Sequence, residues 1–236
     1  MENTGYVALT RQSGLSREMR VIANNIANAA TTGFRQEGMI FSEYVQPVPN
    51  GPSLSMGQGN VRNTSQLQGG LSQTGGSFDL AIEGDGYFLV ETPAGERLTR
   101  AGAFTPNAEG ELVTPGGYRV LDAGGTPMFV PPGTEIAVAR DGTVSADGNP
   151  LGQIGIVLPV SPDHMVREDG VMFRADAGHE PALEARVLQG FLEGSNVDAI
   201  GQLARMIEVQ RAYEMGQSFL EREDERVRAA IRTFFS

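Results

Sequence analysis

The residue types that most often carry catalysis or bind metal are sparse in this chain. Its two histidines, His164 and His179, lie far apart in polar stretches and outside the HExxH spacing of zinc proteases. The chain has no cysteine, which excludes disulfides, thiol nucleophiles and cysteine-ligated zinc. We therefore expect neither histidine to act in catalysis or in metal binding.

Two groups of acidic residues have spacings that indicate turns rather than sites. Glu83 and Asp85 flank a glycine at the end of an expected strand, where they face water and not a cleft of the kind a glycosidase needs. The segment from Asp141 resembles a calcium loop, but Ala146 stands where that loop needs glycine and Gly152 where it needs glutamate. No phosphate-binding or nucleophile motif occurs. We predict no catalytic residue, no metal site and no cofactor.

Composition limits the partners and the location. Lys and Arg total 18 against 29 Asp and Glu, a net charge of -11, so the chain lacks the basic surface that nucleic acids and anionic membranes require. The longest apolar run, 154–160, is too short to cross a bilayer. The first residues do not show a basic segment followed by an apolar segment, which is the pattern of a secretory signal. We expect no nucleic-acid partner and no membrane insertion.

The first structural element is an expected helix over residues 5–31. Its apolar residues recur at spacings of 4, 3 and 4, which is the pattern of a coiled-coil seam and requires a partner helix. The seam consists of Leu15, Met19, Ile22 and Ile26.

Glycine and asparagine mark the end of this helix. Gly33 suits a left-handed residue just past the helix, and Phe34 is expected to fold back as the hydrophobic contact of the stop. Asn24, Asn25 and Asn28 are weak helix formers. Either the helix tolerates them near its end, or they form interhelical hydrogen bonds that fix the register of a bundle.

A second long helix is expected at the other end of the chain, starting near Ser195, with Ser195 as N-cap and Asp198 completing a capping box. A helix with a one-sided stripe is only marginally stable alone and gains its stability by packing. Its stripe consists of Ile200, Leu203, Ile207, Tyr213, Leu220, Val227, Ile231 and Phe234.

Between the two helices the pattern is that of strands and turns. Residues 35–77 are predicted to be an extended linker or assembly segment with one extended stretch at 60–67. Residues 78–187 carry short strands separated by turn signals, which favours an antiparallel module. We predict a hairpin of 80–82 with 87–90, and Asp-Gly turns at Asp141 and Asp147.

The predicted fold class is therefore α+β. Long N- and C-terminal helices form a coiled-coil-like pair, and a central antiparallel all-β module lies between them in the sequence. The predicted domains are 1–34 (N-terminal helix), 35–77 (linker), 78–187 (β module) and 188–236 (C-terminal helix).

Several sequence blocks, found in the same order, resemble the flagellar rod, hook and hook-filament family. The N-terminal block VIANNIANAATTGFR at 21–35 resembles the motif that closes the first helix of these proteins. The other blocks are DLAIEGDGYF at 79–88, LTRAGAF at 98–104, GELVTPGGY at 110–118, RDGTVS at 140–145, LEGSNV at 192–197 and MIEVQRAYE at 206–214.

This resemblance implies an axial structural protein. The terminal helices of that family pack as coiled coils in an inner tube, outside which the β module lies. Its members are exported unfolded by the flagellar type III apparatus without a cleaved signal, so the resemblance implies a rod in the periplasm. The implied partners are other rod proteins, copies of this chain and the export apparatus.

We expect the assembly interface to involve the seam residues, the two asparagines Asn25 and Asn28, and Phe34. The full set is Leu15, Met19, Ile22, Asn25, Ile26, Asn28, Phe34, Leu203, Ile207, Tyr213 and Leu220.

The short length and single β module favour a proximal rod subunit that links the motor and export apparatus to the distal rod and transmits torque. The alternatives are a distal rod or hook-type protein of the same family, and an enzyme such as a periplasmic hydrolase on an all-β scaffold.

Overall fold

The computed structural model describes residues 2–46 and 54–234, and the side chains of 7–40 and 63–233. The chain forms two compact units, each built from separate stretches of sequence. The helical unit comprises Met1–Ala27, Gln36–Ser65 and Asp198–Ser236, and the β unit comprises Asn28–Arg35 and Gln66–Val197. The predicted fold class, α+β with two packed terminal helices and an antiparallel β module, is confirmed.

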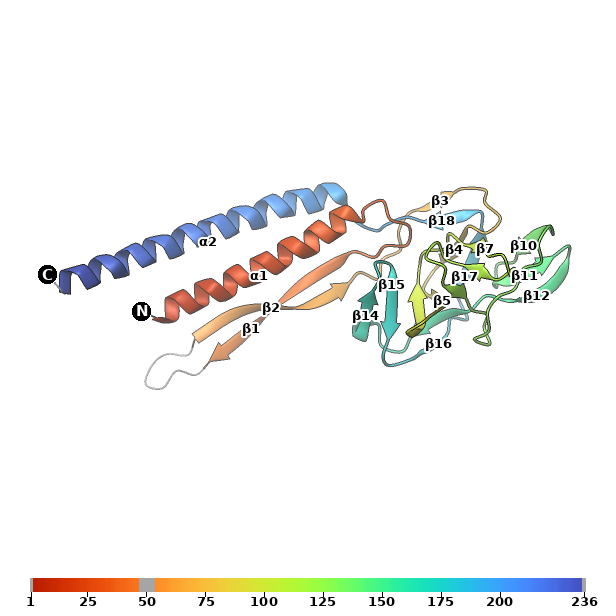
Figure 1. Ribbon diagram of the computed structural model, residues 1–236, viewed down its shortest axis with the longest axis horizontal. Coiled ribbons are helices and arrows are strands. Elements are labelled where there is room, and N and C mark those ends of the chain that lie inside the picture. Colours follow the sequence, from red (N-terminus) through yellow and green to blue (C-terminus); the bar gives the residue numbers. More distant parts are fainter. Residues whose placement is uncertain (1, 47–53, 235–236) are drawn as a thin grey trace. The chain divides into compact units, whose positions relative to one another are not determined.

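The helical unit is an antiparallel helix pair with a hairpin packed along one helix (Figure 1). Helix α1 is Glu2–Ala27 and helix α2 is Ala199–Phe234. The hairpin strands β1 (Glu37–Gln46) and β2 (Leu54–Thr64) are antiparallel, with one register shift opposite the step from Ile40 to Phe41. Helix α1 therefore packs against both α2 and the hairpin.

Helix α2 is longer than its partner, with 36 residues against 26. Val7 of α1 lies near Phe219 of α2, where both line one groove. Since α1 begins at Glu2, the last turns of α2 extend beyond it, as Figure 1 shows. Val227 and Ile231 in this stretch are 40% and 51% exposed.

The structure differs from the sequence prediction in two places in this unit. About half of the segment expected as a linker with one extended stretch, residues 37–46 and 54–64, forms a paired hairpin, because α1 supplies a surface that its two strands can pack on. Helix α2 begins at Ala199, and its cap is Asp198 rather than Ser195: Asp198 Oδ1 accepts from Ile200 N at 3.2 Å.

All strand pairs described in the β unit are antiparallel. A nine-stranded sheet has the order β14-β15-β6-β5-β9-β8-β7, with β13 bridging β5 to β16. The remaining sheets are β10-β11-β12, β17-β4 and β18-β3.

The strands of this unit are short and follow one another closely. The first nine are β3 Leu71–Gln73, β4 Leu80–Glu83, β5 Tyr87–Thr92, β6 Gly95–Thr99, β7 Thr105–Pro106, β8 Leu112–Val113, β9 Arg119–Val120, β10 Ile136–Val138 and β11 Thr143–Ala146. The others are β12 Asn149–Gln153, β13 Ile156–Pro159, β14 Met165–Glu168, β15 Met172–Ala175, β16 His179–Pro181, β17 Arg186–Gln189 and β18 Phe191–Glu193, with the 3₁₀ helix η1 at Pro162–His164.

One main hydrophobic core lies under these strands. Phe88 is fully buried and meets Phe104 edge-on at a centroid distance of 5.2 Å. Leu80 and Ile82 of β4 and Val187 of β17 are buried in the same cluster. The short strands are therefore held by a shared interior and not by long ladders.

The predicted hairpin of 80–82 with 87–90 is wrong. Strand β4 pairs with β17, and β5 pairs with β6, β9 and β13. Gly84 and Gly86 both have positive φ, 94° and 142°, and they redirect the chain to another sheet instead of closing a two-residue turn.

The two Asp-Gly turn predictions are confirmed. Asp147 and Gly148, with φ of 48° and 82°, connect Ala146 directly to its partner Asn149, as a type I′ hairpin turn requires. The Asp141–Gly142 turn connects β10 to β11, and Gly142 N donates to Ala139 O at 2.9 Å.

We predict that Leu80→Ala lowers the free energy of unfolding of the β unit by about 2–5 kcal/mol, because Leu80 is 1% exposed within the core. Leu183→Ala is the matched control: Leu183 is 91% exposed, so its loss should change stability by less than about 0.5 kcal/mol. Urea unfolding followed by circular dichroism measures both. Equal midpoints for the two variants would contradict this description of the core.

Candidate assembly interface

The expected interface residues of α1 mostly face the inside of the helical unit. Ile22 is 4% and Asn25 1% exposed, while Leu15, Met19 and Ile26 are half-buried. This face stabilises the unit itself, which fits the marginal stability of isolated helices.

The expected residues of α2 are divided between two faces. Tyr213 and Leu220 are half-buried, on the side where Val209 is 2% exposed. Leu203 and Ile207 are 52% and 51% exposed. The predicted seam of α2 is therefore two surfaces, one directed at α1 and one left open.

Asn25 ties three elements of the helical unit together. Its Nδ2 donates to Glu37 O at 2.7 Å and to Gln202 Oε1 at 3.1 Å, and its Oδ1 accepts from Glu37 N at 2.9 Å. The amide thus pairs with the backbone of β1 as a neighbouring strand would, and bonds to α2 as well. The interhelical hydrogen bond expected of the asparagines is present at this position.

Asn28 and Phe34 lie beyond the end of α1, in the β unit. Asn28 Oδ1 accepts from Thr31 Oγ1 at 3.1 Å. Phe34 is 1% exposed, and the Arg167 guanidinium lies 4.5 Å from its ring centroid. This cation–π contact holds the Phe34 ring within the β unit.

Other polar contacts brace the two helices. Arg205 donates to Glu18 Oε1 at 2.7–2.8 Å, and Glu18 is largely buried. Gln12 Nε2 donates to Tyr213 O at 2.9 Å. A Cβ on Gly216 would lie only 2.5 Å from Gln12 Nε2, so this glycine, unfavourable in a helix interior, makes room for the Gln12 amide.

In the β unit, the segment that follows α1 lies in close contact with a second loop. Gly33 has φ +68°, which confirms the left-handed conformation predicted for it, and its N donates to Glu193 O at 2.8 Å. A Cβ on Gly33 would stand 2.3 Å from Ala101 N. Glycine is therefore required here by conformation and by space.

A buried arginine–glutamate junction lies beside this contact. Glu193, 1% exposed, accepts from Arg35 at 3.0 Å, from Arg100 at 3.0 Å and from Gly69 N at 3.0 Å. Arg35 also donates to the carbonyl of Gln66 at 3.2 Å. The junction joins the segment between α1 and β1, the segment before β3, the residue that follows β6 and the last residue of β18.

The junction holds more positive than negative charge. Arg100 donates to Ile82 O at 3.1 Å and to Gly84 O at 2.5 Å, and stands 5.4 Å from the Tyr87 ring. Burial lowers the pKa of Arg100 and Glu193 opposes that shift. Burial also raises the pKa of Tyr87, against the effect of Arg35 and Arg100.

These three junction residues were not predicted from the sequence. Each is a charged residue inside a block that carries the family resemblance: Arg35 closes the first, Arg100 lies in LTRAGAF and Glu193 in LEGSNV. The sequence signal for these residues was a charged residue among glycine and apolar neighbours. That signal does not show that the three residues meet, because their meeting depends on pairing between distant segments.

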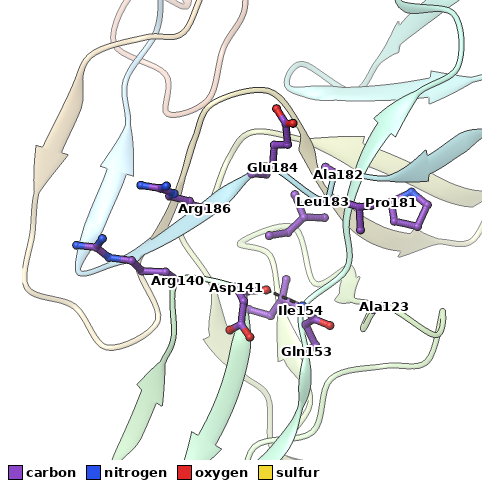
Figure 2. Close-up of a pocket in the computed structure, with 12 residues that line it drawn as sticks. Ala123, Arg140, Asp141, Gln153, Ile154, Pro181, Ala182, Leu183, Glu184 and Arg186 are labelled. Atoms are coloured by element: carbon purple, nitrogen blue, oxygen red, sulfur yellow. Dashed lines mark hydrogen bonds between the residues drawn. The ribbon is translucent and has the colours of Figure 1, made fainter.

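A pocket in the β unit has a volume of about 630 Å³ (Figure 2). It is lined by charged residues of both signs, including Arg140, Asp141, Glu184 and Arg186. Hydrogen bonds from the Thr143 amide and hydroxyl lower the pKa of Asp141. These hydrogen bonds stabilise the turn at Asp141, and Gln153 donates to the Asp141 carbonyl at 2.7 Å.

Two kinds of feature are absent from the part of the chain that the structure describes. Within it, no three His, Asp or Glu residues are grouped so that they could hold a metal ion. No helix there is both long and apolar enough to cross a membrane.

Comparison with known families assigns both ends and the middle of the chain. Residues 6–35 match the family described as flagella basal body rod protein, and residues 188–233 match the flagellar basal body rod FlgEFG protein C-terminal family. Residues 81–146 match the flagellar hook protein FlgE/F/G D1 domain. The chain belongs to the flagellar basal-body rod and hook protein family, whose members are structural proteins that assemble with other rod proteins.

Individual relatives refine this assignment. The chain is 39% identical to the flagellar basal-body rod protein FlgF of Caulobacter vibrioides, over 98% of this chain and 97% of that protein. It is 36% identical to FlgF of Mesorhizobium japonicum, over 100% and 99%. Its identity to the basal-body rod protein FlgG of Agrobacterium fabrum is 34%, over 93% and 94%.

We predict that Glu193→Gln destabilises the β unit by about 3–5 kcal/mol, because it leaves two buried guanidinium groups without their counter-charge. Glu184→Gln makes the same chemical change at an exposed position and should be nearly neutral. Differential scanning calorimetry of the purified chains compares them. A Glu193→Gln transition that matches the Glu184→Gln transition would show that the junction contributes nothing.

We also predict that Gly33→Ala is more damaging than Gly178→Ala. Both glycines have positive φ, which costs an alanine about 1–2 kcal/mol, but only at Gly33 would the new Cβ meet backbone atoms, since nothing lies within 4 Å at Gly178. Thermal unfolding should therefore shift clearly more for Gly33→Ala. Equal shifts would mean that the contact with Ala101 relaxes freely.

Proposed function

We propose that this chain is a structural subunit of the flagellar basal-body rod, placed in its proximal part and assembled through its two terminal helices. There it links the motor and export apparatus to the distal rod and transmits torque. It reaches the periplasm through the flagellar type III apparatus without a cleaved signal. Its partners are other rod proteins and copies of itself.

The observation that carries this proposal is the open face of α2. Ile200, Leu203 and Ile207 lie on successive turns of one face and are 80%, 52% and 51% exposed. Contiguous exposed apolar side chains on a helix mark an interaction surface. The same helix already uses another face to bind α1, so the helical unit is stable as a pair and still offers a surface to neighbours.

The division of labour among the predicted residues follows from burial. Ile22 and Asn25 hold the helical unit together, and Tyr213 and Leu220 contribute from α2. Leu203 and Ile207 contact neighbouring subunits, and the half-buried Leu15 contributes to the same contact. Residues 1–34 and 188–236 supply the inner tube of the rod, 35–77 the assembly segment and 78–187 the outer module.

We assign no catalytic role to the chain, since its family is structural. The second candidate function is a distal rod or hook-type protein of the same family; the 34% identity to a basal-body rod protein FlgG is lower than the 39% and 36% identity to two FlgF proteins. Imaging of purified basal bodies distinguishes the two by where density for this chain lies.

We predict that cells carrying Leu203→Asp fail to build rods and do not swim, because a carboxylate replaces an apolar contact between subunits. The isolated chain should remain folded within about 0.5 kcal/mol, since Leu203 is half-exposed. Leu203→Met keeps the apolar character and should leave swimming intact. Swimming assays and electron microscopy of basal bodies provide the readout, and normal rods with Leu203→Asp would refute the role of the α2 face.

A further inference from the structure

The helical unit has an apolar groove on the surface between its two helices. It has a volume of about 380 Å³, within the range of protein binding pockets. Its lining is mostly apolar, and Arg11 is its one charged member. The lining residues are Val7, Ala8, Arg11, Gln12, Leu15, Ala212, Met215, Gly216 and Phe219.

One residue that lines the groove, Gln12, has a side-chain oxygen that forms no hydrogen bond in the described structure. Gln12 is 8% exposed and its Nε2 bonds to Tyr213 O, yet its Oε1 is buried and accepts no hydrogen bond in the described structure. A buried acceptor left unsatisfied costs about 1–3 kcal/mol. Apart from Arg11 and Gln12, the lining of the groove is apolar.

The open face of α2 has the complementary form. Ile200, Leu203 and Ile207 follow the i, i+3, i+7 spacing by which an amphipathic helix enters a hydrophobic groove. These three residues, called the α2 stripe, lie nearer the start of α2 than the groove, which α2 lines with residues between 212 and 219.

We propose that the α2 stripe of one copy docks in the α1–α2 groove of the next copy of this chain. The docked stripe would add a third helix to the existing α1–α2 contact at Gln12 and Gly216, and so would continue that interface. The proposal rests on the proposed function, for which it names the surfaces that meet and the partner.

The positions of the two surfaces determine the kind of assembly. Leu203 and Met215 represent their centres and are twelve positions apart in one helix, which is about 18 Å along its axis. Copies joined in this way are displaced in one direction, so the contact is heterologous and open-ended. A closed two-fold dimer would need one surface that pairs with itself.

The size of the contact explains why copies need an assembly to stay joined. Three side chains in a groove of this volume bury far less than the roughly 1,200–2,000 Å² of a stable protein–protein interface. The stripe–groove contact is therefore weak between two free chains and becomes stable only where further contacts hold the copies together.

The absence of cysteine from the chain permits a specific test by disulfide cross-linking. Leu203→Cys with Met215→Cys places one thiol on the stripe and one in the groove. The control combines Leu203→Cys with Glu221→Cys, an exposed position on α2 outside the groove. Ile207→Cys replaces Leu203→Cys if the first variant does not build rods.

Basal bodies are purified from cells that carry each pair, oxidised and separated without reductant. We expect bands at multiples of 25.2 kDa for the stripe–groove pair and at least tenfold less for the control pair. A cross-link to a different protein would overturn the choice of a second copy as occupant.

Two other outcomes separate this proposal from the function it rests on. Basal bodies that contain the chain, but in which neither stripe cysteine cross-links to the groove, overturn the stripe–groove contact and leave the rod function intact. Basal bodies that lack the chain altogether overturn the proposed function and this contact together.

Discussion

The β unit depends on a single buried carboxylate. Glu193 accepts hydrogen bonds from two buried guanidinium groups and from a backbone amide, and without it Arg35 and Arg100 would be isolated charges in a low-dielectric interior. The backbone around this group is equally constrained, since Gly33 approaches Ala101 too closely for any side chain. The ion pairs and the close backbone contact thus bring the same segments together, those around Arg35, Arg100 and Glu193.

In the helical unit, a neutral polar side chain rather than a buried charge fixes how the elements pack. Its helices have modest apolar faces and would be marginal in isolation. Asn25 adds direction to this packing, because its amide satisfies both backbone groups of Glu37 and also reaches Gln202. A buried polar group of this kind fixes register, so that the remaining apolar side chains of α2 face outward in a defined row.

Local patterns in the sequence were sufficient to predict the two helices, the left-handed Gly33 and the Asp-Gly turns. They failed where distant segments decide the structure. Strand β4 pairs with β17, which lies about a hundred residues later, and not with its neighbour. Helix α2 starts after Ser195 because the preceding backbone is engaged elsewhere, with Asn196 N bonded to Phe34 O.

The candidate interface was predicted in part for the same reason. The apolar spacing of α2 identified Leu203, Ile207, Tyr213 and Leu220 as important, but spacing alone does not say which of two nearby faces meets α1. That division required the position of Val209, the most buried of the α2 residues whose side chains the structure describes. The junction of Arg35, Arg100 and Glu193 was missed because a buried charge is recognisable only with its partners.

The unequal lengths of the helices make the C-terminal turns of α2 more sensitive to ionic strength than the part that lies beside α1. Where α1 lies alongside, Glu18 is sheltered from solvent in its pair with Arg205. Beyond the reach of α1, the local pairs are exposed ones such as Arg228 with Asp224 at 2.9 Å, each contributing about 0.2–0.5 kcal/mol to helix stability. Salt screens exposed pairs far more than sheltered ones, so added salt loosens the C-terminal turns of α2 while its braced portion stays helical.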